Sequence, residues 1–555
     1  LNTAARLEAA CTPGEVVVGE DTWRLTRSTI RYAGLGAIEL RGKRGDVPAF
    51  RAIDEAATDD SATPFVGRDR ELRLLIDVID EAAAARDVRL VTVIGAPGVG
   101  KTRLAEELER THLGDATFMN IRIERSGGTT FSPVAELLRI AAGLEDARTS
   151  NEVSARIRSV VDGLDDADHV ASLLASFVGV AEPRSTEELF FAVRRLLEAV
   201  GRTRPVVLVV DDIQWAGPRM LDLLEYVADW VDDTPAVILG LARPELRETR
   251  PALAERSRRV AETIALEGLD DGATAELAAQ LVGAATLPDD LLHRLPESTE
   301  GNPLFVRELM KMLVDDRVIV EGEQGWELTV DAEAVEVPPT IQSLLSSRIE
   351  RLPGNERRML ERASVVGTDF PLGAVATLTP QGDAGRLIPI VERLRRKELV
   401  EPTGSYWGNE PIFRFHHALI RDAAYRRLLK RTRADHHLTV VEWMEGAGRG
   451  VTGEHEVTVG YHLESAHDLR LQLNISDEET AEIGVLAAKA LGTAAQRALG
   501  RDDVAAASSL AARAVKLLDP DSPDLPDLLM LGCEAFFTLG DVSAGVPLLE
   551  QLEDL

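Results

Sequence analysis

The chain has 555 residues, of which 45% are hydrophobic and 28% charged, so at roughly 150 residues per domain three or four globular domains are expected. Its formal net charge of −31 argues against a partner such as nucleic acid and against docking on an anionic membrane surface. The two cysteines, Cys11 and Cys533, lie far apart without a CxxC motif, which argues against a disulfide framework or structural zinc site.

No apolar run reaches the length of a membrane span, and no signal peptide opens the chain, so we expect a cytoplasmic protein without a membrane partner. The chain begins at Leu1 inside a patterned segment, so we expect it to be a piece of a longer gene product. Residues 1–54 are predicted to form a short α/β piece. It has a helix over the first ten residues, a strand at Glu15–Gly19 and a hairpin-like stretch that ends near Phe50. The small, acidic residues 55–63 are predicted to be a linker.

Residues 64–268 alternate apolar runs with helical stretches of ten to twenty residues, the pattern of βαβ units with a parallel sheet and helices on both faces. Continuous Val/Ile/Leu runs are typical of strands that are covered on both faces. The predicted buried strands are Leu90–Ile94, Ala116–Ile123, Val206–Val210 and Ala236–Leu241.

The remainder of the chain is predicted to be mostly helical. Residues 269–335 form a helical domain with room for a hairpin over Val318–Leu328. Residues 336–445 combine helices with a short strand pair, Leu399–Pro402 and Ile412–Phe415, as in a winged helix. In residues 446–555 two similar turns, ALGRDD and TLGDVS, recur forty residues apart and indicate tetratricopeptide-like helix pairs, although an unrelated helical bundle stays open. The predicted fold class is thus multidomain α/β plus α.

The segment GAPGVGKT fits the P-loop pattern G-x-x-x-x-G-K-[ST] at every fixed position, between the strand VTVI and the helix TRLAEELER. Glycines let the backbone wrap around phosphates, and the loop N–H groups with the helix N-terminus favour an anion. Lys101 supplies charge at the β- and γ-phosphates, and the Thr102 hydroxyl can bind Mg²⁺. The predicted nucleotide-binding residues here are Gly95, Ala96, Pro97, Gly98, Val99, Gly100, Lys101, Thr102 and Arg103.

About a hundred residues later, the apolar strand PVVLVV runs into Asp211 and Asp212. An acid at the carboxyl end of a parallel strand lies beside the phosphates. We expect Asp211 to hold Mg²⁺ and Asp212 to orient or deprotonate the attacking water. The next apolar strand ends at Arg243, which is placed to sense the γ-phosphate and to act in catalysis with Asp212 and Lys101. Two acids opening a polar loop and a solvated arginine are the simpler alternatives.

These motifs together resemble the signal-transduction ATPases with numerous domains (STAND), a P-loop class related to AAA+ proteins. Four segments carry the likeness: TPFVGRDREL, DDIQWA, EGNPLFVREL and FRFHHALIRDAAY. The resemblance implies that Val66, Gly67 and Arg68 lie against the adenine and ribose, that Pro303 touches the base, and that His417 monitors the nucleotide. A surface arginine, a helix-start proline and a satisfied histidine are the alternatives at these positions.

The N-terminal segment LNTAARLEAACTPGEVVVGEDT is similar to the final part of class III adenylate/guanylate cyclase domains. Asn2 and Arg6 match the two polar residues that contact the nucleotide in that family, and a spacing of four places them on one helix face. The metal-binding aspartates of the family would precede Leu1, so we expect no cyclase activity from this chain alone.

The resemblance implies an ATPase with ATP/ADP and Mg²⁺ as cofactors, which hydrolyses slowly and switches between an ADP-bound closed state and an ATP-bound open state. It would regulate an attached cyclase or another output. A protein partner or small-molecule inducer would bind the C-terminal helical repeats, and a nucleotide-dependent oligomer is a further expectation. Two alternatives stay open: an AAA+ remodeller or loader acting on nucleic acid or protein, and a nucleotide-binding scaffold with little turnover.

Overall fold

The computed structural model of the chain divides into two compact units, residues 1–65 and 66–555, which are described separately. The structure describes residues 17–19, 30–38, 47–55, 64–112, 116–123, 131–144, 149–178, 180, 185–254, 260–283, 287–322, 325–329, 338–380, 387–407, 410–446, 455–501 and 503–555. Cys11, the predicted helix over residues 1–10, and Asn2 and Arg6 within it lie outside these residues, so the predictions for them stay untested.

The first unit contains a three-stranded antiparallel sheet in the order β1-β3-β2. β1 spans Val17–Gly19, which confirms the predicted first strand, and β2 (Ile30–Ile38) pairs with β3 (Val47–Glu55) as the expected hairpin. The hairpin continues beyond Phe50 to Glu55, so the first residue of the predicted linker (55–63) belongs to β3, and residues 56–63 lie outside the described residues.

The second unit opens with a five-stranded parallel sheet in the order β5-β6-β7-β4-β8. Its strands are β4 (Val88–Gly95), β5 (Thr117–Arg122), β6 (Val206–Asp211), β7 (Ala236–Ala242) and β8 (Val260–Leu266). The first four confirm the predicted buried strands. The prediction lacked β8, because Glu262 and Thr263 interrupt its apolar run, as an edge position allows.

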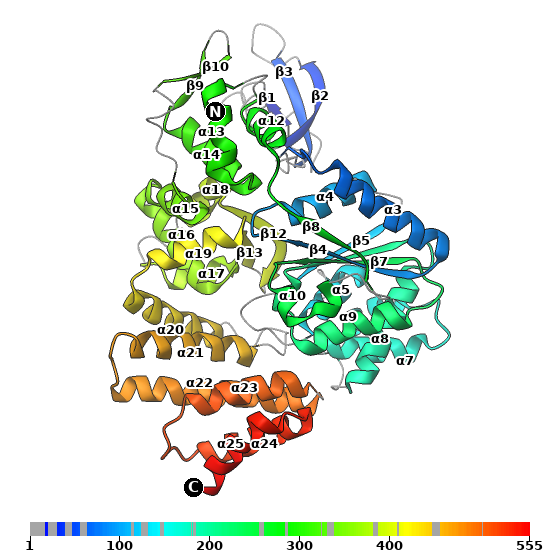
Figure 1. Ribbon diagram of the computed structural model, residues 1–555, viewed down its shortest axis with the longest axis vertical. Coiled ribbons are helices and arrows are strands. Elements are labelled where there is room, and N and C mark those ends of the chain that lie inside the picture. Colours follow the sequence, from blue (N-terminus) through cyan, green and yellow to red (C-terminus); the bar gives the residue numbers. More distant parts are fainter. Residues whose placement is uncertain are drawn as a thin grey trace. The chain divides into compact units, whose positions relative to one another are not determined.

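Helices cover both faces of this sheet, with α3 (Asp69–Ala85) and α4 (Lys101–Thr111) on one side and α5 (Ser132–Ala142) and α7–α9 toward the other (Figure 1). The large apolar core joins residues of β4–β7 to α5–α9. Capping boxes at Thr149 and Ser185 start α6 and α8. The remaining elements are α6 (Ser150–Val160), α7 (Ala167–Phe177), α8 (Thr186–Val200), a 3₁₀ turn η2 (Ile213–Trp215), α9 (Pro218–Trp230), α10 (Leu246–Thr249) and α11 (Pro251–Ala254).

The helical domain follows with α12 (Asp271–Leu281), α13 (Asp289–Thr299) and α14 (Pro303–Asp315). The hairpin β9 (Ile319–Gly322) and β10 (Gly325–Leu328) confirms the one expected over Val318–Leu328. Val66, at the start of the unit, belongs to the apolar core of this domain and not to that of the sheet.

The described residues between 338 and 446 form a bundle with a three-stranded antiparallel sheet in the order β11-β13-β12. The predicted strand pair is present, and β11 adds a third strand, but the winged-helix assignment itself stays a prediction. The elements are α15 (Ile341–Glu350), α16 (Gly354–Val366), β11 (Asp369–Pro371), α17 (Leu372–Thr377), α18 (Leu387–Arg396), β12 (Val400–Trp407), β13 (Glu410–Phe415), α19 (Ala418–Arg427) and α20 (Lys430–Gly446).

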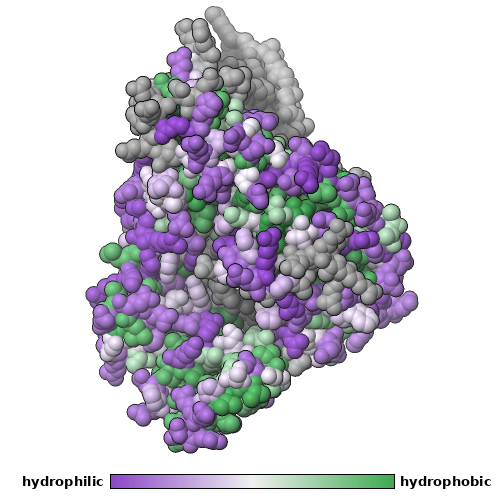
Figure 2. Space-filling view, in the orientation of Figure 1, coloured by the Kyte–Doolittle hydropathy of each residue, from purple (hydrophilic) through white to green (hydrophobic). Residues whose placement is uncertain are grey.

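The C-terminal helices are α21 (His455–Leu471), α22 (Glu478–Gly500), α23 (Val504–Lys516), α24 (Leu525–Leu539) and α25 (Val542–Glu553), and each packs on the next. Each of the two similar turns supplies an aspartate, Asp503 or Asp541, whose carboxylate caps the following helix. Helix pairs are therefore present, whereas their tetratricopeptide nature stays a prediction. Exposed apolar side chains such as Met530 and Val542 lie on α24 and α25, where hydrophobic residues show at the surface (Figure 2). Among the described residues no helix is long and apolar enough to span a bilayer.

A buried histidine pair joins α20 to α21. Nδ1 of His437 lies 2.7 Å from Nδ1 of His462, and the Tyr425 hydroxyl lies 2.9 Å from Nε2 of His437. Burial lowers the pKa of His462 to about 3, with a further contribution from the Arg421 charge, and lowers the pKa of His437 well below its usual value. Both rings are therefore neutral in the folded protein at neutral pH.

This neutrality predicts acid sensitivity. Between pH 6.5 and about pH 3, His462 binds a proton in the unfolded chain but not in the folded chain. The free energy of unfolding therefore decreases as the pH falls through this range. From pH 6.5 to 5.0, His462 alone should cost about 2 kcal/mol of unfolding free energy. Urea unfolding across this range should therefore show a shallower pH slope for His462→Asn than for a His169→Asn control at an exposed position. Equal slopes would contradict the account.

Candidate nucleotide site

Three neighbouring strands end at one edge of the parallel sheet and carry the predicted site residues. β7 lies between β4 and β6 and pairs with both. β4 leads into the P-loop, β6 ends at Asp211, and Arg243 directly follows β7. Ligands of open parallel sheets bind at the carboxyl ends of the strands. The fold thus brings together residues that are up to 148 positions apart, Gly95 to Arg243.

The P-loop has the backbone that its glycines predict. Gly98 and Gly100 have φ angles of 81° and 102°, which L side chains rarely adopt, and α4 begins directly afterwards at Lys101. The Lys101 ammonium donates to the carbonyls of Gly95 and Ala96 at 2.9 and 3.1 Å. Burial lowers the pKa of Lys101, although the charges of Asp211 and Asp212 oppose this. An anionic phosphate would favour the charged lysine.

Thr102 and Asp211 are brought together as the sequence predicts. The Thr102 hydroxyl donates to Oδ2 of Asp211 at 3.2 Å. Adjacent ligands of an octahedral Mg²⁺, each at about 2.1 Å, lie roughly 3 Å apart, so these two oxygens fit one ion. Burial, followed by the neighbouring Asp212 charge, raises the pKa of Asp211, so a cation would stabilise its carboxylate. The donor set fits Mg²⁺, and its role stays a prediction.

Asp212 has a different environment from its neighbour. Its φ of 58° places it in the left-handed region, where the extended backbone of β6 ends and the turn η2 begins. The guanidinium of Arg122 donates to Oδ2 at 2.8 Å, and the Gln214 amide donates to Oδ1 at 2.8 Å. Burial would raise the pKa of Asp212, but the Arg122 charge and these hydrogen bonds hold it below its ordinary value. Asp212 is therefore an ionised carboxylate whose two oxygens both already accept hydrogen bonds within the chain.

Arg122 lies beside the two acids and was not among the predicted site residues. It ends β5 and lies opposite Asp211 in the register of β5 and β6. The pKa of Arg122 is raised: burial alone would lower it, but the charges of Asp211 and Asp212 outweigh burial. The sequence signal was faint, since a lone arginine after the strand TFMNI has no motif around it. Only the order of the strands places it beside the acids.

Arg243 lies close to the same acids. Its backbone N–H donates to the Gln214 side-chain oxygen at 3.0 Å, and its guanidinium lies 5.6 Å from the centre of the Trp215 ring. Its charge helps to lower the pKa values of both Lys101 and Asp212. This location suits a phosphate sensor, a role that stays a prediction.

The predicted base-side residues have further partners within the chain. Gly67 has a φ of 68°, and a Cβ there would come within 2.7 Å of Ala273 on α12. Arg68, which is buried, donates to the Glu267 carbonyl and pairs with Glu71 at 3.4 Å. Val66 and Gly67 therefore tie the start of the unit to the helical domain, whereas Arg68 binds the segment that directly follows β8.

Pro303 and Arg103, two further predicted nucleotide contacts, lie at or beside the P-loop and α4. Pro303 is the first residue of α14, and its Cγ lies 4.0 Å from an ideal Cβ at Gly100, so it borders the P-loop. Arg103 on α4 pairs with Glu107 at 3.0 Å. Their contacts with a nucleotide stay predictions.

The two histidines after β13 take separate roles. Nδ1 of His417 accepts the Leu419 N–H at 3.1 Å and caps α19. Burial, with the charges of Arg307 and Arg122, lowers the pKa of His417 to about 3. The preceding His416 lies 3.0 Å from Arg307 of α14 and 3.1 Å from Glu401 of β12.

Because an arginine can only donate, Nε2 of His416 accepts from Arg307, and its Nδ1–H therefore donates to Glu401. His416 thus links the helical domain to the predicted winged helix. His417 itself stays a predicted nucleotide monitor.

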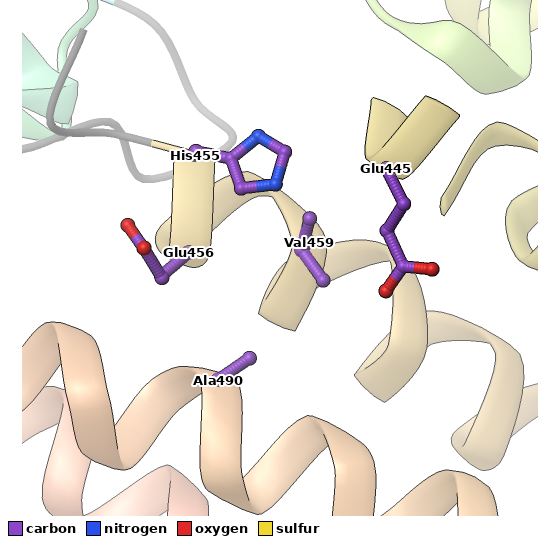
Figure 3. Close-up of a pocket in the computed structure, with 5 residues that line it drawn as sticks. All are labelled: Glu445, His455, Glu456, Val459 and Ala490. Carbon is purple, nitrogen blue, oxygen red and sulfur yellow. The ribbon is translucent and has the colours of Figure 1, made fainter. Parts of the chain in front are cut away.

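Two cavities lie elsewhere in the described residues. One, of about 300 Å³, lies between α20, α21 and α22 and is lined by Glu445, His455, Glu456, Val459 and Ala490 (Figure 3). The other, of about 270 Å³, lies between α15 and α19 and includes Thr340 and Arg426. Neither is lined by a P-loop residue.

Comparison with known proteins gives two family matches. Residues 64–239 match the AAA ATPase domain, and residues 270–325 match a domain of unknown function (DUF8739). The first match covers the P-loop, Arg122, Asp211 and Asp212. The chain contains an AAA ATPase domain. The matching family is described as an ATPase, and the two family matches leave residues 1–54 and 446–555 outside their bounds.

An uncharacterized protein of Rhizobium meliloti (strain 1021) is 25% identical over 460 residues, which cover 78% of this chain and 43% of that protein. The chain therefore spans less than half the length of this curated relative. The Aeropyrum pernix Orc1 protein in complex with DNA matches with a TM-score of 0.31 and 14% identity, over 67% of this chain and 95% of Orc1. Cdc6p of Pyrobaculum aerophilum matches with a TM-score of 0.32 and 14% identity, over 67% and 99%. These scores are too low to carry an argument.

The Arg122–Asp212 pair predicts the direction of a rate change. A carboxylate whose pKa is depressed is a weaker general base, so Arg122→Gln should strengthen Asp212 while leaving it ionised at pH 7.5. We expect single-turnover ATP hydrolysis to rise about 3- to 10-fold. Arg110→Gln, which removes an exposed arginine from the Glu107 pair on α4, is the matched control. A rate equal to or below that of the parent would show that Arg122 positions the base instead of restraining it.

Proposed function

We propose that the chain is a nucleotide-controlled AAA ATPase in which ATP binding and slow hydrolysis change how the helical domain and the winged-helix-like region dock on one site. This proposal rests on one observation: two later parts of the chain lie beside the predicted nucleotide site. The start of α14 borders the P-loop, and the residues after β13 lie near Arg122 and Arg307. The presence or absence of a γ-phosphate would therefore affect three parts of the chain: the P-loop domain, the helical domain and the winged-helix-like region.

In this account the P-loop N–H groups and Lys101 bind the phosphates, and Thr102 with Asp211 would hold Mg²⁺. The ion, when bound, would neutralise charge that develops on the phosphate oxygens. Asp212 would accept the proton of the attacking water, and Arg243 would sense the γ-phosphate from its position between the P-loop and the acids. Since both oxygens of Asp212 are occupied by Arg122 and Gln214, we expect slow turnover.

The output has two candidates. One is a STAND-like signalling switch that regulates an attached cyclase or another domain, with the cyclase resemblance of residues 1–54 as its support. The other is an AAA+ ATPase that acts on a macromolecular partner. The family description favours the second, because it names an AAA ATPase and neither a cyclase nor a signalling class. The net charge of −31 favours a protein partner over nucleic acid, and the C-terminal helices would provide the docking surface.

Two substitutions test the catalytic assignment. Asp212→Asn should keep Mg–ATP affinity within about twofold but reduce single-turnover hydrolysis at least about 100-fold, because the proton acceptor is lost. Lys101→Ala should lose measurable ATP affinity in calorimetry. Hydrolysis by Asp212→Asn at the parent rate would require another base, and unchanged affinity of Lys101→Ala would remove the P-loop from the account.

The same preparations separate the two outputs. Tightly bound ADP in the purified protein and a slow rate that duplex DNA leaves unchanged are expected for a switch acting on protein. A fast rate would instead establish the second candidate, which acts on nucleic acid if duplex DNA raises the rate and on a protein partner if it does not. ATP binding without hydrolysis by the parent chain would reduce it to a scaffold.

A further inference from the structure

The N-terminus of α14 is attached directly to the outside of the P-loop. The side-chain amide of Asn302 donates to the Pro97 carbonyl at 3.0 Å, and the Leu304 N–H donates to the Gly98 carbonyl at 3.2 Å. The approach is close, since an ideal Cβ at Gly98 would lie 2.9 Å from both the Asn302 side-chain oxygen and Leu304 Cβ. These contacts join residues that are 205 positions apart.

Holding these carbonyls fixes which way the loop N–H groups point. The carbonyl and the following N–H of a trans peptide point in opposite directions, and no cis bond occurs in the described residues. A Pro97 carbonyl held toward α14 therefore turns the Gly98 N–H away from α14. Backbone N–H groups of this loop are the donors that cradle phosphates. Asn302 thus acts on the phosphate cradle from outside it.

The identity of the side chain separates this contact from ordinary helix capping. The Asn302 oxygen accepts from the N–H groups of Leu304 and Phe305 at 3.1 and 3.3 Å, which caps α14. Serine and aspartate cap helices about as well as asparagine. Only an amide of this length offers an acceptor to the helix and, at the same time, a donor to the loop. The P-loop contact, and not the cap, therefore requires asparagine here.

We propose that Asn302 is a positioning residue of the nucleotide site, which couples docking of the helical domain to phosphate affinity. The proposal rests on the proposed function, because it takes the P-loop as the nucleotide site. Coupling is reciprocal: if docking of α14 strengthens phosphate binding, bound phosphate strengthens docking of α14 by the same factor. The helical domain then responds to the nucleotide through the loop backbone, in addition to any contact with the base.

Three variants of the full chain test the proposal. Asn302→Ser keeps a helix cap but lacks the reach to Pro97, Asn302→Ala removes both functions, and Asp270→Ser changes the cap of α12 in the same domain. Calorimetric Kd values for ADP and Mg–ATP and the thermal unfolding midpoint without nucleotide are measured for each. Loss of one hydrogen bond predicts about 3- to 10-fold weaker ADP binding by Asn302→Ser. Because the same bond is present without nucleotide, the midpoint of Asn302→Ser should fall, but by less than that of Asn302→Ala, and Asp270→Ser should bind as the parent does.

The comparison of serine with alanine decides the outcome. If Asn302→Ser binds nucleotide as weakly as Asn302→Ala while its unfolding midpoint stays above that of Asn302→Ala, the P-loop contact is established. If Asn302→Ser binds as the parent does and only Asn302→Ala is weakened, capping is the whole role of Asn302 and the proposal is overturned. Lys101→Ala distinguishes failure of this proposal from failure of the proposed function. If the P-loop were not the nucleotide site, Lys101→Ala would bind nucleotide as the parent does.

Discussion

The structure depends on one constraint, namely that β4, β7 and β6 are parallel neighbours that end at the same edge of the sheet. This order places the P-loop, Arg243 and the two acids beside one another without any of them being close in sequence. It also places β5 outside β6, so the arginine that ends β5 meets the acids from the other side. The start of α14 and the residues after β13 lie beside this edge, although they come later in the chain.

The two adjacent aspartates differ in their pKa shifts: the pKa of Asp211 is raised and that of Asp212 is lowered. Two buried neighbouring carboxylates disfavour each other's charge, so their environments must differ if both are to ionise. Asp211, with burial raising its pKa, is suited to a cation, whereas Asp212 is kept ionised by Arg122, Gln214 and Arg243. Two neighbouring titratable groups whose pKa values are shifted in opposite directions usually take different chemical roles. The separation supports the assignment of Asp211 to the metal and Asp212 to the base, and the same hydrogen bonds explain why hydrolysis should be slow.

Much of this arrangement could be predicted from local patterns. The P-loop, the acidic strand end and four of the five strands of the parallel sheet carry strong signals, because glycine spacing and buried Val/Ile/Leu runs are properties of short segments. β8 was missed because an edge strand tolerates Glu262 and Thr263. Arg122 and Asn302 were missed as site residues because their partners, Asp212 and Pro97, are 90 and 205 positions away and become neighbours only through the strand order and the docking of α14. No local pattern encodes such contacts.

The central claim is that the nucleotide controls docking of α14 and of the residues after β13 on the P-loop. Amide hydrogen exchange reports local opening directly. We expect the N–H groups of α14 and of β13–α19 to exchange slowly with ADP and faster with Mg²⁺ and a non-hydrolysable ATP analogue. The sheet strands β4 and β6 should remain equally protected in both states. Identical exchange of α14 and β13–α19 with the two nucleotides, each bound at saturation, would contradict the account.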